Sequence, residues 1–355
     1  MKRRFYLHVG GHKTGSSAQQ VWFANNGVAL NAAGLVYPAE ITGAHGNCVR
    51  IAEAWGKDPN TWSAQNALNM MQFSELIEEH PHLDVLFSAE YFSEDSTERH
   101  LTAVAADLSE YGFEVRPVMY VRNQIDQLSS LYAQRIKLLN TDLSFDCALR
   151  ELTSMQRADW HRYFERHSAL GWSTAIGAFG RKREHSIVES FFALAGLKDR
   201  FPVETDFRVD EINPSLGAIG VLVSLHVARH IISRRLSMPH NGNVYFSRCL
   251  IAASAEIEDR RFIGPDKSDR EYIRARYASG NQAIAKLLPD DETALLLTEQ
   301  LPEGPASPRT FAELSATDRA RAEACMELCR AKLLDYTPIH RFLSPEMIRQ
   351  IPRIS

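Results

Sequence analysis

The sequence predicts an α/β protein of three layers (α/β/α), in which helices cover both faces of a central parallel sheet. Three short apolar runs rich in β-forming residues support this prediction, at Phe5–Val9, Val85–Phe87 and Val115–Val121. Each run is followed by polar or glycine residues and then by a helix-like stretch. Strands that alternate with helices in this way favour a parallel sheet, which buries both of its faces.

The other elements are expected from apolar spacing and from residues that begin or end helices. An apolar face recurs between residues 123 and 139, and Gly196 stands where a preceding helix would end. In chain order we expect a helix after Ser16 that Asn26-Gly27 ends, a helix over 123–139, a sheet element over 172–179, and helices over 186–197, 214–236 and 318–334.

The chain of 355 residues is long enough to bury a full hydrophobic core. We expect one main domain over residues 1–300, with an α/β core over 4–140 and a mainly helical region over 141–300. The proline-rich stretch Leu301–Pro308 is expected to act as a connector. Residues 301–355 would then form this connector and a C-terminal helical appendage.

Composition excludes several classes of partner. With 40 Lys and Arg against 44 Asp and Glu, the net charge of −4 argues against nucleic acid or an anionic membrane surface. No run reaches the roughly 18 apolar residues that span a bilayer, and the first residues lack a signal peptide's apolar stretch, so we expect a cytoplasmic protein without a membrane span. The five scattered cysteines are expected to be reduced thiols. Cys325 and Cys329 are interpreted as helix-packing residues, because no second pair at zinc spacing accompanies them.

The segment Lys13-Thr14-Gly15-Ser16-Ser17 follows the first predicted strand and two glycines. A strand that enters a glycine-bearing turn and then a helix exposes backbone N–H groups at the helix N-terminus, where the helix dipole also favours an anion. The hydroxyl groups of Thr14, Ser16 and Ser17 add donors, and Lys13 adds a compact positive charge. This segment therefore predicts a phosphate-binding loop.

The lysine's place within the loop bears on the chemistry. A nucleoside-triphosphatase loop has the pattern G-x-x-x-x-G-K-[ST]. Counted from Gly10, the chain fits as far as Gly15, but Ser16 stands where that pattern requires lysine. We therefore expect chemistry other than magnesium-dependent transfer of a γ-phosphate.

A second cluster begins where the third predicted strand ends. Arg122 stands at that end, and Ser130 follows eight residues later on the next expected helix. An arginine at a strand end and a serine in the following helix can converge on a second phosphate, which the guanidinium would bind through paired hydrogen bonds.

Together the two clusters resemble the sulfotransferases that use 3′-phosphoadenosine 5′-phosphosulfate (PAPS). In that family a lysine-bearing loop binds the 5′-phosphosulfate, and an Arg and a Ser eight residues apart bind the 3′-phosphate. Residues 13–17 match the loop, with Ser-Ser where the family often has Thr-Thr, and Arg122 and Ser130 match the second motif. The resemblance covers residues 4–135 well, is diffuse to about 290 and is absent beyond.

The resemblance implies a P-loop-like nucleotide-binding fold with donor binding in the core over 4–140 and acceptor binding in the region over 141–300. The donor would be PAPS, the product 3′,5′-adenosine bisphosphate, and no metal would be required. The implied donor-binding residues are His12, Lys13, Thr14, Gly15, Ser16, Ser17, Arg122 and Ser130.

A third cluster concerns the proton that an acceptor hydroxyl must lose. The strand at Val85–Phe87 leads to Glu90, and a carboxylate at a strand end beside the loop is placed to act as a base. The resemblance implies the same role, because the family's base is a His or a Glu. His45 is the rival base or an acceptor-binding residue, and Glu90 has an alternative role in ordering its loop.

The expected reaction is sulfuryl transfer, with catalytic roles for Lys13, Glu90 and His45, to a hydroxyl or amine of a saccharide, glycolipid or small metabolite. A P-loop kinase-like phosphotransferase is the enzymatic alternative. It is disfavoured by Ser16 and by the lack of a magnesium-binding aspartate at the end of the Val85 strand. A catalytically silent nucleotide-binding adaptor on the same fold is the other alternative.

Overall fold

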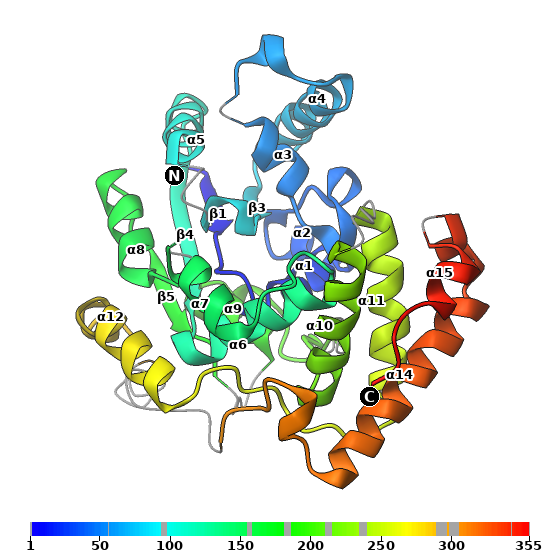
Figure 1. The fold of residues 1–355 in the computed structure, drawn as a ribbon. Helices are drawn as coiled ribbons and strands as arrows, with labels where there is room; N and C mark the ends of the chain where they lie inside the picture. Colours follow the sequence, from blue (N-terminus) through cyan, green and yellow to red (C-terminus); the bar gives the residue numbers. More distant parts are fainter. Residues whose placement is uncertain are drawn as a thin grey trace. The chain divides into compact units, whose positions relative to one another are not determined.

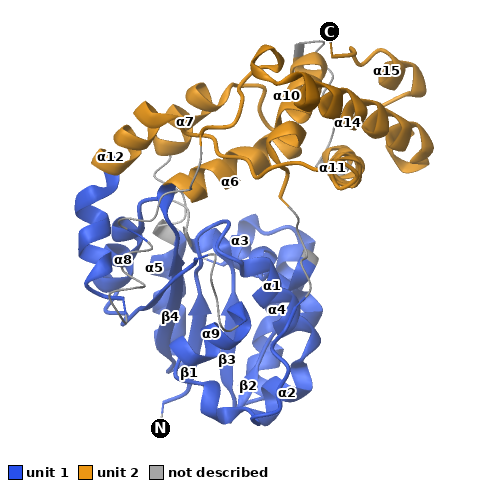
Figure 2. Ribbon diagram, turned by 90° about the horizontal axis from the view of Figure 1, so that it is seen from below, with its two compact units in different colours: residues 1–124, 155–213, 276–300 blue, residues 125–154, 214–275, 301–355 orange. Residues whose placement is uncertain are grey.

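The computed structural model describes residues 2–55, 57–93, 98–154, 158–180, 186–209, 215–233, 240–288, 297, 305–341 and 343–354. The chain divides into two compact units, coloured separately in Figure 2. Unit 1 comprises residues 1–124, 155–213 and 276–300, and unit 2 comprises residues 125–154, 214–275 and 301–355.

Unit 1 is built on one five-stranded sheet with the strand order β2-β3-β1-β4-β5. Figure 1 labels β1, β3, β4 and β5, and Figure 2 labels β2. All four pairings between neighbouring strands are parallel. The strands are β1 (Arg4–His8), β2 (Leu35–Val36), β3 (Asp84–Ser88), β4 (Glu114–Val121) and β5 (Ala175–Ala178). The prediction of an α/β protein with a parallel sheet is confirmed.

Helices cover both faces of this sheet. Among the described residues, unit 1 contains the helices α1 (Ser16–Asn25), α2 (Gly27–Ala32), α3 (Val49–Ala54), α4 (Ala64–Glu79), α5 (Glu98–Glu110), α8 (Trp160–Ala169), α9 (Ile187–Leu194) and the second half of α12 (Lys267–Ala285). Short 3₁₀ helices include η2 (Ala44–Gly46) and η4 (Glu90–Ser93).

The two faces have separate aromatic clusters. On one face Phe5 and Phe87 pack against Trp55, which follows α3, with ring centroids 5.9 and 5.7 Å away. On the other face the ring of His8 lies 5.5 Å from that of Phe191 in α9, which also contacts Phe23 of α1. Residues 5 and 8 of β1 have opposite parity, so one strand supplies both clusters, and the unit has three layers.

Local sequence accounts for the ends of α9. Ser186 precedes the helix, and its hydroxyl accepts a hydrogen bond from the backbone N–H of Glu189 at 3.0 Å, which satisfies one of the helix's first donors. Gly196 lies just after the helix in the left-handed region with φ of 67°. A helix therefore lies within the predicted stretch 186–197, and it spans Ile187–Leu194.

Unit 2 is helical, with α6 (Gln124–Lys137), α7 (Phe145–Ser154), α10 (Ala218–Ser233), α11 (His240–Ser254), the first half of α12, α14 (Ala316–Asp335) and α15 (Pro345–Arg349). α14 packs on both α10 and α11, and Cys325 and Cys329 are buried on it. α14 thus shares a core with α10 and α11 of the same unit.

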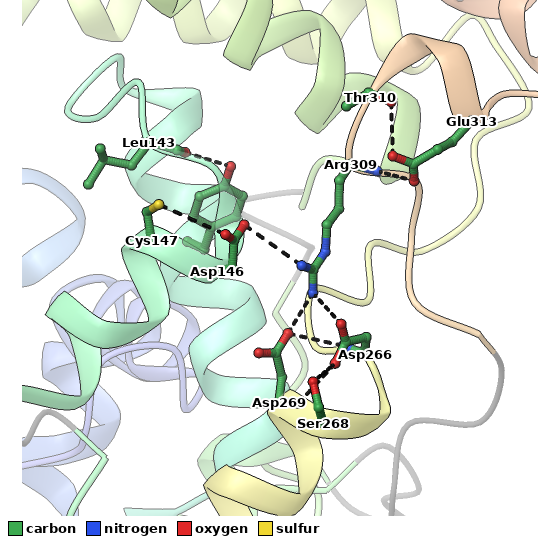
Figure 3. Close-up of polar contacts among 10 residues, drawn as sticks. Leu143, Asp146, Cys147, Asp266, Ser268, Asp269, Arg309, Thr310 and Glu313 are labelled. Carbon is green, nitrogen blue, oxygen red and sulfur yellow. Dashed lines mark hydrogen bonds and ion pairs between the residues drawn. The ribbon is translucent and has the colours of Figure 1, made fainter.

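An ionic cluster holds the segment before α14 within unit 2 (Figure 3). The guanidinium of Arg309 lies 3.0 Å from the carboxylate of Asp266, 2.6 Å from that of Asp269 and 3.8 Å from that of Asp146. Asp266 also accepts a hydrogen bond from the backbone N–H of Asp269 in the first turn of α12. One arginine therefore joins the segment that follows the proline-rich stretch to the starts of α7 and α12.

Within the described ranges, no helix combines the length and the apolar character needed to cross a membrane.

Candidate functional site

The predicted phosphate-binding loop lies between β1 and α1 in unit 1. Lys13 and Gly15 both adopt the left-handed region, with φ of 70° and 87°. The buried hydroxyl of Thr14 donates to the carbonyl oxygen of Gly11 at 2.6 Å and so closes the loop on itself. Gly15 directly precedes α1, so the backbone turns sharply just before the helix N-terminus, as the sequence predicts.

The buried ring of His8 packs against the loop at Gly10. Its Nδ1 lies 2.8 Å from the hydroxyl of Ser88 in β3, and its ring is fully buried. Burial lowers the pKa of His8 to about 4, so the ring is neutral at neutral pH. A Cβ at position 10 would lie only 2.5 Å from His8 Nε2, so Gly10 is required where the loop crosses the ring.

Glu90 comes to the loop from the neighbouring strand. The backbone N–H of Ala89 donates to the carbonyl of His8, so β1 and β3 stay joined up to Glu90. The Glu90 carboxylate accepts a hydrogen bond from the hydroxyl of Ser16 and lies 3.5 Å from Nδ1 of His12. Burial raises the pKa of this carboxyl, but His12 and Ser16 together outweigh burial, and the pKa lies below its ordinary value.

Arg122 comes to the loop from the strand on the other side of β1. Its Nη1 donates to the carbonyl oxygen of Lys13 at 2.7 Å, and its guanidinium lies 5.2 Å from the centre of the Phe179 ring. Trp160 of α8 holds the backbone, because its indole N–H donates to the carbonyl of Arg122 at 2.8 Å. Arg122, which the sequence analysis singled out, therefore contacts the loop.

Phe179, which the sequence analysis did not single out, is part of this arrangement. It follows β5, and a Cβ added to Gly15 would lie 2.7 Å from its ring. The ring is thus packed between the loop glycine and the arginine. The available signal was an aromatic residue at the end of the sheet element predicted over 172–179.

The surroundings of Lys13 lower the pKa of its amine. Burial lowers the pKa of the half-buried Lys13 amine, the positive charge of Arg122 lowers it further, and Glu90 opposes both. Two cations and one carboxylate from three neighbouring strand ends therefore meet at the start of α1. A bound anion would relieve the repulsion between the cations.

A side-chain amide pair anchors the chain just after Arg122. The Nε2 of Gln124 donates to Oδ1 of Asn281 in α12 at 2.6 Å, and the Nδ2 of Asn281 donates back to Oε1 of Gln124 at 2.9 Å. Gln124 is buried. This reciprocal pair fixes the point where β4 passes into α6.

The remaining predicted residues lie as follows. Ser17 is half-buried in the first turn of α1. His45 is exposed, in the left-handed region with φ of 61°, on a turn whose next residue, Gly46, packs on α1. Among the described residues, no hydrogen bond or ion pair joins His45 to the loop. Ser130 lies two turns into α6 and belongs to unit 2.

The part of the chain that the structure describes contains no group of three or more His, Cys, Asp or Glu side chains that could hold a metal ion.

Comparisons with known proteins add no relative: no family model matches the chain, and neither the curated proteins nor the solved structures include a match.

Proposed function

We propose that the protein is a sulfotransferase that moves a sulfuryl group from PAPS to a hydroxyl or amine of a saccharide, glycolipid or small metabolite. The observation that supports this most is the meeting of Lys13, Glu90 and Arg122 at one loop. They come from the ends of three adjacent parallel strands, and ligands of open α/β sheets bind at that edge. The fold would then be of the P-loop-like sulfotransferase kind.

In this proposal the residues of the loop bind the 5′-phosphosulfate. The backbone N–H groups that start α1 and the Lys13 ammonium would hold its oxygens, with the hydroxyls of Thr14 and Ser17 close by. Arg122 would exchange its hydrogen bond to the Lys13 carbonyl for the donor's 3′-phosphate. The protein's own cations would supply the neutralising charge, and no metal is invoked.

The transfer itself is in line. A lone pair of the acceptor oxygen or nitrogen attacks sulfur, and the bond between sulfur and the bridging oxygen breaks. Its electron pair leaves with the 5′-phosphate of 3′,5′-adenosine bisphosphate, where Lys13 offsets the developing charge. The acceptor's proton passes to the cluster around Glu90, or to His45 if its turn approaches the acceptor.

The loop chemistry disfavours the kinase alternative. Ser16 occupies the position of the nucleoside-triphosphatase lysine, and its hydroxyl is hydrogen-bonded to Glu90. The arrangement therefore supplies a carboxylate where a γ-phosphate site requires a cation.

Ligand binding tests the proposal first. Thermal unfolding is measured with 3′,5′-adenosine bisphosphate and, separately, with ATP and magnesium. A ligand at one hundred times its dissociation constant stabilises a fold by about 2.7 kcal/mol. We expect stabilisation by the bisphosphate and its loss in Arg122→Ala. A shift with ATP and magnesium alone would favour the kinase alternative and overturn the proposal.

Turnover separates an enzyme from an adaptor. With PAPS labelled in its sulfuryl group, we expect slow release of sulfate to water even without an added acceptor. Binding of the bisphosphate without any release would favour the catalytically silent adaptor.

A further inference from the structure

We propose that His12 is the group that takes the acceptor's proton, and that Glu90 is a positioning residue that holds the His12 ring. This inference rests on the proposed sulfuryl transfer and names the base within it. It departs from the expectation that Glu90 itself removes the proton.

The first step of the argument is that both oxygens of Glu90 are already engaged. One accepts the hydrogen bond from Ser16, and the other lies 3.5 Å from Nδ1 of His12. The Glu90 side chain is 16 % exposed and that of His12 is 29 % exposed. The carboxylate is thus the more covered member of the pair, and the imidazole is the more accessible one.

The second step concerns basicity. A carboxylate that accepts hydrogen bonds in its ionised form is a weaker base, because those bonds stabilise the ion. The pKa of Glu90 accordingly lies below its ordinary value. Imidazole is the side chain whose ordinary pKa lies nearest neutrality, and proton transfer is most efficient when the base's pKa is near the working pH.

The third step is the direction of the ring. The two nitrogens of an imidazole point in diverging directions, so a ring whose Nδ1 faces Glu90 has its Nε2 turned away from that carboxylate. With Nδ1–H toward the carboxylate, the neutral ring carries its lone pair on Nε2. The carboxylate also stabilises the imidazolium that forms when Nε2 gains a proton, as the acid does in a Ser-His-Asp triad.

The proposed step then balances. The acceptor's O–H or N–H proton goes to Nε2 of His12 while the acceptor atom forms its bond to sulfur. The bond from sulfur to the bridging oxygen breaks, and its electron pair leaves on the phosphate beside Lys13. Proton release from His12 to water restores the neutral ring.

The charges around the pair set its pH behaviour. The Lys13 ammonium acts on Glu90 as a cation and has Arg122 as its own cationic neighbour, while the neutral ring of His8 is a further neighbour of Glu90. A protonated His12 would help to bind the anionic donor but could not accept a proton. We therefore expect kcat to rise with pH through one ionisation while the donor's KM also rises.

The test uses release of labelled sulfate from PAPS to water, measured as a function of pH in the full-length chain. His12→Gln should lower kcat by about 10²- to 10⁴-fold and abolish the rise of kcat with pH, here called the rising limb of the pH profile. It should leave binding of 3′,5′-adenosine bisphosphate within a few fold of the wild type. Glu90→Gln keeps an acceptor for Ser16 but loses the charge, so it should lower kcat less and move the limb to lower pH.

The matched control is His161→Gln. His161 forms another His–carboxylate pair, with its Nδ1 3.6 Å from the carboxylate of Glu165 one turn further along α8. This variant should leave both kcat and the pH profile unchanged. Melting temperatures of all three variants identify any that fail to fold. If His12→Gln fails to fold, His12→Asn replaces it.

Three results would overturn the inference, and they are distinguishable. If Glu90→Gln abolishes turnover while His12→Gln retains it with the limb intact, Glu90 is itself the base. If His45→Gln abolishes turnover while His12→Gln retains it with the limb intact, His45 is the base. If the wild type binds no bisphosphate or releases no sulfate, the proposed function fails and the assignment of His12 fails with it.

Discussion

The guanidinium of Arg122 donates a hydrogen bond to the carbonyl oxygen of Lys13, across 2.7 Å. This bond ties the end of β4 to a residue that holds the left-handed backbone conformation, with φ of 70°. Left-handed backbone costs about 1–2 kcal/mol for a residue with a Cβ, so the surrounding contacts must hold Lys13 there. One arginine thereby helps to hold the shape of the loop.

Replacement of Arg122 by alanine should therefore weaken donor-product binding strongly. Loss of a charge-assisted hydrogen bond to a phosphate costs about 1.5–3 kcal/mol, which corresponds to a rise of more than tenfold in the dissociation constant. Arg122→Lys should recover only part of this, because an ammonium lacks the paired donors of a guanidinium. Calorimetric titration with 3′,5′-adenosine bisphosphate measures both.

The matched control is Arg116→Ala on the same strand, since Arg116 is paired with Glu114 toward the other end of β4. It should leave the dissociation constant unchanged. Equal losses in the two arginine variants would show that β4 as a whole, and not Arg122, carries the effect.

Substitution of Gly15 by alanine should destabilise the fold in two separable ways. The backbone at φ of 87° is strained for alanine, and the new Cβ would lie 2.7 Å from the Phe179 ring. Gly171 also has positive φ, of 73°, but nothing lies within 4 Å of a Cβ placed there. Gly171→Ala therefore measures the backbone cost alone, about 1–2 kcal/mol.

Urea unfolding of both variants gives the comparison. We expect Gly15→Ala to lose more than Gly171→Ala, and Phe179→Ala to reduce the difference when combined with Gly15→Ala. If the two glycine variants lose the same free energy, the ring of Phe179 does not press on the loop.

Acid should destabilise the protein through His8. The pKa of His8 is about 4 in the fold against 6.5 for an ordinary histidine, because the ring is buried. Between these values the unfolded chain binds a proton that the folded chain does not, so the free energy of unfolding falls as pH falls from about 7 to 4. The full difference is about 3 kcal/mol.

Urea unfolding at several pH values tests this on His8→Gln. The variant should be less stable at pH 7 but should lose less stability on acidification than the wild type. His161→Gln, at the surface of α8, should keep the wild-type slope. An unchanged slope in His8→Gln would contradict a neutral buried ring.

Removal of Arg309 should loosen unit 2. Its side chain is 29 % exposed, and its guanidinium contacts three aspartates, which would be left without this cation. We expect Arg309→Ala to lower the free energy of unfolding by about 1–3 kcal/mol, in the range found for hydrogen bonds to charged groups. Arg208→Ala, which removes a fully exposed pair with Asp206, should have no measurable effect.

Much of the sheet could be predicted from local sequence. The apolar runs at β1, β3 and β4 and the element containing β5 are long enough to show their character, and the structure confirms them. Leu35–Val36 could not be found, because two residues carry no periodicity. The helix of α14 was expected, but its packing on α10 and α11 depends on contacts distant in sequence, which a local pattern does not contain.

The candidate site divides in the same way. Lys13, Glu90 and Arg122 could be expected at one edge because parallel strands end together there. The engagement of Glu90 by Ser16 and His12 could not be foreseen, since it depends on side-chain directions within a strained loop. Phe179 and Trp160 reach Arg122 from elements far along the chain, and nothing in the spacing of their own segments marks them.

The amide pair of Gln124 and Asn281 has a consequence for how the site responds to its surroundings. Neither amide gains or loses a proton at any ordinary pH, and neither carries a charge for dissolved ions to screen. The hydrogen bonds between Gln124 and Asn281 therefore do not depend on pH or on ionic strength. A change of pH or of salt concentration can alter the charges of Lys13, Glu90 and His12, while the amide pair that anchors the backbone just after Arg122 is unchanged.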